Sequence, residues 1–162
     1  MRRVYFLRHA EAEGLVTNDR ARRLTQHGVE QACRVGTFLR GVGLTGVFVL
    51  TSPYERALMT AELVAGKAGY GEPVVADWLG CGMEAAGCRR ECRRLFESGV
   101  DGDVLLVGHE PDLSAAMSEW MGGVSRVKFK KATLAGLRVK VFEAGGGVLE
   151  FFVPCSMMNN AC

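Results

Sequence analysis

The sequence lacks a long apolar run, a large net charge and a secretory leader. No apolar stretch approaches the ~20 residues that a membrane-spanning helix needs, so we expect no membrane partner. The net charge is +2, which by itself is too small to indicate a nucleic-acid partner. The apolar stretch near the N-terminus is short and is interrupted by Arg8 and His9, unlike a signal peptide. We therefore predict a cytoplasmic protein.

The chain also lacks linkers, internal repeats and low-complexity segments. Its 162 residues, of which 48% are hydrophobic, are enough to build one globular domain with a sizeable core. We predict a single domain over residues 1–162.

Six cysteines are present, but they lack the paired C-x-x-C spacing that is typical of zinc sites. Cys81, Cys88 and Cys92 lie closest together, and no histidine is near them in the sequence. Without a secretory leader, reduced thiols are the default state. Free thiols are therefore favoured over a zinc site, and we expect no metal and no cofactor.

Short apolar runs alternate with amphipathic segments along the chain. This order predicts a three-layer αβα sandwich, an α/β fold with a mostly parallel central sheet and helices on both faces. A polar, Arg-rich stretch over residues 10–24 predicts a loop. The predicted strands are 2–8, 46–53, a short one within 72–78, 102–111, 134–143 and 147–153, and the predicted helices are 25–41, 54–69, 84–98 and 112–123.

Polar residues follow three of the predicted parallel strands. Arg8 and His9 follow the first strand, Ser52 follows the second with Arg56 one helical turn later, and His109 follows the fourth. Ligands of such sheets bind beyond the carboxyl ends of the strands. We therefore expect these side chains to converge at one edge, beside the loop that carries three further arginines, Arg20, Arg22 and Arg23.

A cluster of two arginines and two histidines without carboxylate partners would repel itself unless an anion bound there. Guanidinium groups match the oxygens of a phosphoryl group, and a neutral imidazole is a competent nucleophile toward phosphorus. Taken singly, each residue is also typical of a solvated strand end, a structural histidine or a surface charge. Their coincidence at one edge favours a functional site.

Three motifs contain these residues: Arg8-His9-Ala10, then S-P-x-x-R-A-x-x-T from Ser52 to Thr60, then G-H-x-P from Gly108 to Pro111. In order and spacing they resemble the motifs of the histidine phosphatase superfamily, also called the phosphoglycerate mutase-like family. The resemblance implies a phosphoglycerate mutase-like fold and a metal-independent phosphatase. It also implies that inorganic phosphate or sulfate would occupy the site.

Within that superfamily the chain is most similar to the small SixA-type phosphohistidine phosphatases. It lacks a long helical insert, and the segment from Arg22 to Gly28 is similar to their R-P-L-T-x-x-G. The resemblance implies hydrolysis of a phosphorylated protein through a covalent phosphohistidine intermediate. His9 would be the nucleophile, Arg8 and Arg56 would bind the phosphoryl oxygens, and His109 would stabilise the transition state.

Arg22 occupies the position of that subgroup's loop arginine and would close over the phosphate. Arg20 and Arg23 compete for this role, so the choice among the three stays open.

A general acid is harder to assign. The candidates are Glu84, Glu110 and Asp112: Glu84 lies in the region where larger relatives carry their acid, and Glu110 is next to His109. A loop carboxylate paired with an arginine is an equally good interpretation of Glu110. An N-phosphoryl substrate needs less acid assistance than a phosphomonoester, so the absence of an obvious acid favours phosphohistidine. A phosphomonoesterase for a small phosphorylated metabolite and, less favoured, a non-catalytic phosphate-binding module remain alternatives.

Two basic stretches could bind an acidic partner. One is the Arg-rich segment of helix 84–98, and the other contains Lys128, Lys130 and Lys131. Solvated faces with pairs such as Arg93 and Glu97 are the favoured interpretation of both.

Overall fold

The computed structural model describes residues 2–14, 17–123 and 127–159, and a six-stranded sheet lies at its centre. In that sheet the strand order is β3-β2-β4-β1-β5-β6. The pairs β1–β4, β2–β4 and β2–β3 are parallel, whereas β5 is antiparallel to both β1 and β6. The strands are β1 (Arg2–Arg8), β2 (Val47–Thr51), β3 (Val74–Val75), β4 (Asp103–Gly108), β5 (Leu134–Val139) and β6 (Gly147–Val153).

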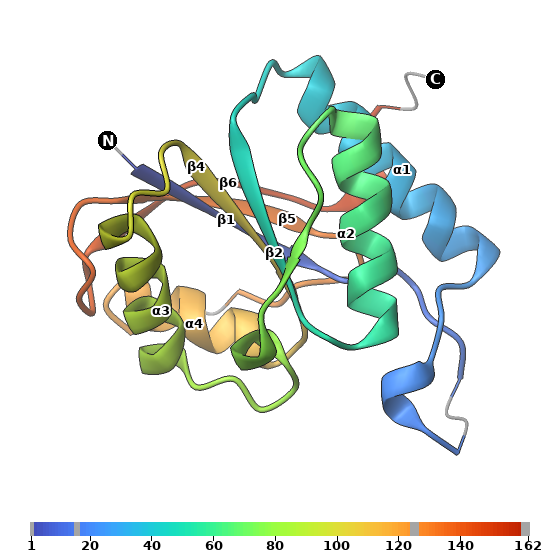
Figure 1. Cartoon of the computed structure of the whole chain (residues 1–162), viewed down its shortest axis with the longest axis horizontal. Coiled ribbons are helices and arrows are strands. Elements are labelled where there is room, and N and C mark those ends of the chain that lie inside the picture. The colour runs from blue at the N-terminus through green and yellow to red at the C-terminus, as the bar shows by residue number, and fades with distance from the viewer. Residues whose placement is uncertain (1, 15–16, 124–126, 160–162) are drawn as a thin grey trace.

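Helices cover both faces of the sheet (Figure 1). On one side lie α1 (Gln26–Gly41) and α2 (Glu55–Ala68), and on the other lie α3 (Ala85–Glu97) and α4 (Asp112–Trp120). Successive residues of β1 point to opposite faces: Val4 and Phe6 enter the core under α3 and α4, and Tyr5 enters the core under α1 and α2. The three-layer sandwich predicted from the sequence is confirmed.

Several elements are shorter than the sequence predicts. Strand β2 stops before Pro53, which has no backbone N–H for a strand ladder. Strand β5 ends at Val139, where the backbone turns into the hairpin to β6 and the Lys140 N–H donates to the Gly146 carbonyl. Helix α4 ends at Trp120, because Gly122 and Gly123 adopt positive φ angles of 89° and 80°.

The start of α1 ties the loop after β1 to the helix layer. Thr25 is the N-cap, as predicted: its hydroxyl accepts from the Gly28 N–H at 3.0 Å and donates to the Glu11 carboxylate at 2.8 Å. Gly28 lies so close to this loop that a Cβ atom there would come within 2.0 Å of the Glu11 carbonyl oxygen. In the T-x-x-G motif, Thr25 therefore caps the helix, and Gly28 allows the close contact with the backbone of Glu11.

We expect Gly28→Ala to destabilise the protein by about 1–3 kcal/mol, the usual cost of overpacking, because a methyl group would collide with the Glu11 backbone. Gly66→Ala in α2 is the matched control, since a Cβ atom there meets nothing within 4 Å. Gly66→Ala should stabilise the folded protein by roughly 0.5–1 kcal/mol, because alanine is more favourable than glycine inside a helix. Urea unfolding of both variants measures the difference, and a neutral Gly28→Ala would contradict the close contact.

Candidate active site

Four of the predicted site residues, Arg8, His9, Arg56 and His109, converge at the carboxyl ends of three neighbouring parallel strands. β4 lies between β1 and β2, so the residues after all three meet at one edge. Backbone hydrogen bonds extend the ladder past the strand ends: the His9 N–H donates to the Gly108 carbonyl, and the Ser52 N–H donates to the Val107 carbonyl, both at 3.0 Å. The positions of His9 and Ser52 are thus fixed by the sheet itself.

His9 is held in one tautomer. Its Nδ1 lies 2.8 Å from the Ala10 carbonyl oxygen, which can only accept, so Nδ1 carries the proton. Nε2 therefore carries the lone pair, which accepts a hydrogen bond of 3.3 Å from the Nε–H of Arg56. The side chain is only 3% exposed. This geometry presents Nε2 as the reactive nitrogen.

Arg56 is buried at the start of α2 and is held from several sides. Its Nη1 donates to the Asp19 carbonyl at 2.8 Å, and its Nη2 lies 3.3 Å from the Asp19 carboxylate and 3.7 Å from the Cys81 sulfur. Its guanidinium also lies 5.0 Å from the ring centre of Tyr54. These contacts orient Arg56 so that its Nε–H points at His9.

His109 lies beside His9, with ring centres 5.2 Å apart. Its Nε2 is 2.7 Å from the Ser52 hydroxyl, which already accepts from the Tyr54 N–H at 3.2 Å. A hydroxyl accepts up to two hydrogen bonds and donates one, so Ser52 can donate to Nε2, and in that tautomer the proton of a neutral His109 is on Nδ1. Nδ1 is buried and has no hydrogen-bond partner among the described residues, so in that tautomer it is a donor available to a ligand.

Arg8 provides a second donor of this kind. Its Nη1 donates to the Phe129 carbonyl at 2.8 Å, whereas its buried Nε has no partner within the part of the chain that the structure describes. Buried donors without acceptors are costly to a folded protein. Two such donors beside one imidazole lone pair form a site suited to an oxyanion.

Both imidazoles are uncharged at neutral pH. Burial, followed by the charge of Lys131, lowers the pKa of His9 to about 2. Burial, followed by the charge of Arg56, lowers the pKa of His109 to about 4. A neutral imidazole is the form that can attack phosphorus.

Sequence reasoning missed a carboxylate at this site. The cluster was expected to lack carboxylate partners, and that expectation was wrong: the Asp19 side chain bridges Arg56 and Arg22, with ion pairs of 3.3 and 3.0 Å. Hydrogen bonding from Arg22 lowers the pKa of Asp19, and the Arg56 charge acts in the same direction. The only indication of this ion pair in the sequence is that an aspartate, Asp19, lies three residues before Arg22.

Of the three loop arginines, Arg22 is the one that the structure joins to the cluster through Asp19. Its Nε also donates to the Glu13 carbonyl at 2.7 Å. Arg20 is exposed, and its guanidinium carbon lies 5.2 Å from the ring centre of Tyr54. Arg23 is exposed, and its backbone N–H contacts the Glu13 carboxylate.

Glu110 anchors a neighbouring segment. Its carboxylate accepts hydrogen bonds from the Phe129 N–H and from the hydroxyl and N–H of Ser114. Phe129 belongs to the segment of residues 127–133 between α4 and β5, which we call the strap. Since the Phe129 carbonyl in turn accepts from Arg8, Glu110 fixes the strap against the cluster.

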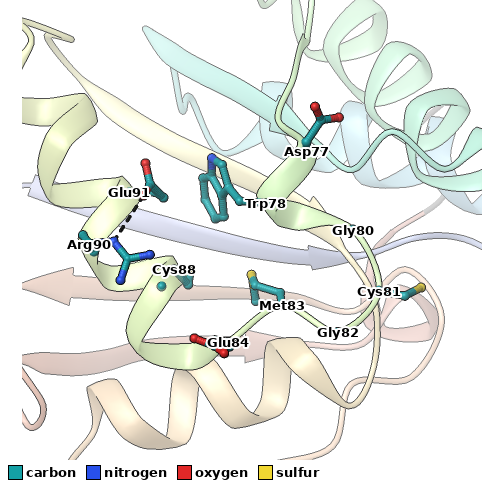
Figure 2. Close-up of a pocket in the computed structure, with 11 residues that line it drawn as sticks. Asp77, Trp78, Gly80, Cys81, Gly82, Met83, Glu84, Cys88, Arg90 and Glu91 are labelled. Carbon is teal, nitrogen blue, oxygen red and sulfur yellow. Dashed lines mark hydrogen bonds and ion pairs between the residues drawn. The ribbon is translucent and has the colours of Figure 1, made fainter.

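Glu84 lies farther away, at the exposed start of α3. It lines a pocket of about 360 Å³ that reaches from Asp77 and Trp78 to Cys81 and the first turns of α3 (Figure 2). Cys81, which contacts Arg56, marks the end of this pocket nearest the cluster, and Figure 2 shows Glu84 on the other side of Gly82. Within the described ranges, no hydrogen bond or ion pair joins Glu84 to the cluster.

The cysteines that the structure describes do not gather into a metal site. Over residues 2–14, 17–123 and 127–159, no group of three or more His, Cys, Asp or Glu side chains could hold a metal ion. Cys88 and Cys92 are buried free thiols on α3, and Cys81 is exposed. Cys162 lies outside the described residues.

The Arg-rich helix is a solvated face except at Arg89, which is largely buried and pairs with Glu119 of α4 at 2.6 Å. Arg93 pairs with Glu97 at 2.8 Å, as predicted, and Arg90 and Arg94 both contact Glu91. Among the three lysines grouped with it, Lys128 and Lys130 are exposed but Lys131 is not.

Comparisons with known proteins agree with this geometry. The model of the histidine phosphatase superfamily (branch 1) matches residues 4–79. An uncharacterised protein of Picosynechococcus sp. is 32% identical, with 83% of this chain and 84% of the relative covered. A phosphohistidine phosphatase SixA homolog of Haemophilus influenzae is 30% identical, with 83% of this chain and 86% of the relative covered.

Solved structures share the fold. The protein histidine phosphatase SixA complexed with tungstate has a TM-score of 0.86 at 23% identity, over 95% of this chain and 97% of that chain. A phosphoserine phosphatase mutant of Entamoeba histolytica in complex with phosphoserine has a TM-score of 0.74 at 15% identity, over 98% and 100% of the two chains. The predicted phosphoglycerate mutase-like fold is confirmed. In the described part of the chain, every helix is too short or too polar to cross a membrane.

We expect the free energy of unfolding to fall as the pH drops from 7 to 5. The unfolded chain takes up protons on histidine near the ordinary pKa of about 6.5, whereas folded His9 and His109 stay neutral, so each contributes a slope of up to about 1.4 kcal/mol per pH unit. The slope ends near the folded pKa of each group, about 4 for His109 and about 2 for His9.

Urea unfolding at pH 7, 6 and 5 tests this expectation. His109→Gln removes one of the two groups and should therefore give a shallower pH dependence than the parent. Equal slopes for parent and variant would contradict a neutral, buried His109.

Proposed function

The chain belongs to the histidine phosphatase superfamily and is a phosphatase, and from this premise we propose that it hydrolyses phosphohistidine on a phosphorylated protein. The observation that carries the proposal is the unprotonated Nε2 of His9, whose lone pair lies among arginine and histidine side chains in a buried cluster. A nucleophile of this kind needs an electrophile that brings its own negative charge, and a phosphoryl group meets that need.

In the proposed reaction, His9 Nε2 attacks the phosphorus atom and forms a new N–P bond. The bond from phosphorus to the substrate's imidazole nitrogen breaks, and that imidazole leaves after taking up a proton. Water then attacks the phosphohistidine on His9, which releases inorganic phosphate and restores the free lone pair. No metal is required, because the arginines carry the positive charge that an ion would supply.

The donors around His9 have complementary roles in this proposal. Arg8 Nε and Arg56 bind two of the non-bridging oxygens, and His109 Nδ1–H donates to the same group. Such donors, fixed before the reaction, stabilise charge on the oxygens in the transition state. Arg22, held by Asp19, would close over the phosphate from the loop. Inorganic phosphate or sulfate would bind in the same place.

The positions of Glu84 and Glu110 support an N-phosphoryl substrate. The Glu110 carboxylate is engaged by Phe129 and Ser114, and Glu84 is exposed on the far side of Gly82. Within the described residues, neither carboxylate forms a hydrogen bond or ion pair with His9, which supports a leaving group that needs no carboxylic acid. A phosphoramidate is labile, and its imidazole needs less assistance to leave.

A phosphomonoesterase for a small metabolite is the second candidate. It is favoured by the shared fold of the phosphoserine phosphatase and by the pocket between Trp78 and Cys81, which could receive the leaving group of a small substrate. A cytoplasmic location remains a prediction under either function.

The deciding experiment compares hydrolysis of a phosphohistidine-bearing carrier protein with hydrolysis of p-nitrophenyl phosphate. We expect rapid phosphate release from the carrier, slow turnover of the phosphomonoester, and loss of both in His9→Ala. His27→Ala is the matched control, because His27 is an exposed histidine on α1, and it should match the parent. Turnover of the phosphomonoester equal to that of the carrier would select the metabolite phosphatase.

We expect Glu84→Gln to leave phosphohistidine turnover within a few-fold of the parent, because within the described residues no hydrogen bond or ion pair joins its carboxylate to the cluster. A general acid usually contributes at least ~10² to the rate. Steady-state kcat on the carrier protein measures the effect, with the exposed Glu72→Gln as control. A drop of ~10² or more in Glu84→Gln alone would identify it as the acid.

A further inference from the structure

The strap, residues 127–133, crosses the end of β1 and is fastened there by its backbone. The Ala132 N–H lies 3.2 Å from the Arg8 carbonyl and 3.3 Å from the His9 carbonyl, and the Arg8 N–H donates to Thr133 at 3.2 Å. The Phe129 backbone adds two bonds to side chains: its carbonyl accepts from Arg8, and its N–H donates to the Glu110 carboxylate. The strap is therefore built onto the residues that flank the nucleophile.

A tight turn sets the direction of the strap at Lys131. The Thr133 N–H donates to the Lys130 carbonyl at 3.1 Å, and Ala132 adopts a positive φ of 54°. A positive φ is uncommon for a residue other than glycine. It occurs here at the residue whose N–H faces the carbonyls of Arg8 and His9, which puts Lys131 at the corner of the turn beside the cluster.

The charge of Lys131 faces mostly like charges. Its side chain is half-buried, and among the described residues no carboxylate forms an ion pair with it. Burial, followed by the charges of Arg8, Arg22 and Arg56, lowers the pKa of Lys131 to about 8, and the charge of Glu11 opposes the shift. The Lys131 charge in turn lowers the pKa of His9 and of His109.

We propose that Lys131 is a further substrate-binding residue, whose ammonium group contacts the phosphoryl group held at His9. The inference rests on the proposed function in that it takes the cluster as the place where a phosphoryl group binds. A half-buried cation among three arginines is unfavourable in the free protein. A bound dianion turns the same arrangement into a favourable one, since each of the four cations then faces negative charge.

The neighbouring lysines provide a matched control. Lys130 lies in the same strap, has the same charge and is exposed. If the strap acted only as a basic surface for an acidic protein, removal of Lys130 and of Lys131 would have similar effects. If Lys131 binds the phosphoryl group, only its removal matters for a small anion.

The experiment measures the affinity of the full chain for inorganic phosphate and for tungstate by titration calorimetry at pH 7. We expect Lys131→Met to weaken both about 10-fold or more, the scale of one charge-assisted hydrogen bond. Lys130→Met should stay within about two-fold of the parent, and Lys131→Arg should restore most of the affinity by restoring the charge. Equal affinities for Lys131→Met and Lys130→Met would overturn the proposal.

Proton uptake gives an independent readout. At pH 8 about half of the Lys131 side chains are neutral in the free protein, and a bound dianion draws a proton onto them. The binding enthalpy of the parent should therefore vary with the ionisation enthalpy of the buffer, and this dependence should shrink in Lys131→Met. An unchanged dependence would also overturn the proposal.

Urea unfolding tests the repulsion at Lys131, and a comparison of phosphate binding with phosphohistidine turnover separates a failure of this inference from a failure of the proposed function. Urea unfolding should place the midpoint of Lys131→Met at or above that of the parent, because a repelled cation has been removed; a lower midpoint would contradict the repulsion argued above. Phosphate binding does not depend on which substrate is hydrolysed. If the parent does not hydrolyse phosphohistidine but Lys131→Met still lowers the affinity for inorganic phosphate, the proposed function fails and the role of Lys131 stands.

Discussion

The hydrogen bond from His9 Nδ1–H to the Ala10 carbonyl is the interaction on which the rest of the site depends, because it decides which nitrogen keeps a lone pair. Ala10 is itself held by Thr60, whose hydroxyl accepts from the Ala10 N–H at 3.1 Å and donates to the Arg56 carbonyl at 2.7 Å. One short chain of bonds thus fixes the tautomer of the nucleophile and connects it to the helix turn that carries Arg56. The spacing from Arg56 to Thr60 is the one-turn spacing that this bridge requires.

The sequence predicted those parts of the fold and site that short-range patterns determine. Apolar runs located β1, β2 and β4, and because parallel strands end at the same edge, the convergence of Arg8, His9 and His109 followed from their positions just after those strands. The N-cap at Thr25 could likewise be predicted from the sequence, and the structure confirms it. Element ends were less accurate, since they depend on where neighbouring strands stop pairing.

The parts that were missed depend on contacts between distant segments. Asp19 reaches Arg56 because a loop folds back over α2, and Lys131 reaches the cluster because the strap bonds to the backbone of Arg8, more than a hundred residues earlier. Neither residue belongs to a periodic segment. The contrast between Lys130 and Lys131, adjacent and identical in type, shows how completely the turn at Ala132 decides their environments.

The ion pair between Asp19 and Arg56 has a consequence for the lifetime of bound oxyanions. A carboxylate fixed to the same chain as the arginine acts as a tethered competitor, whose effective concentration at Arg56 is in the millimolar range or above. It is present at every binding event and cannot diffuse away. An oxyanion at Arg56 is therefore held less tightly than the surrounding cations alone would hold it, which in an enzyme that ends each cycle with an anionic product shortens the residence of that product.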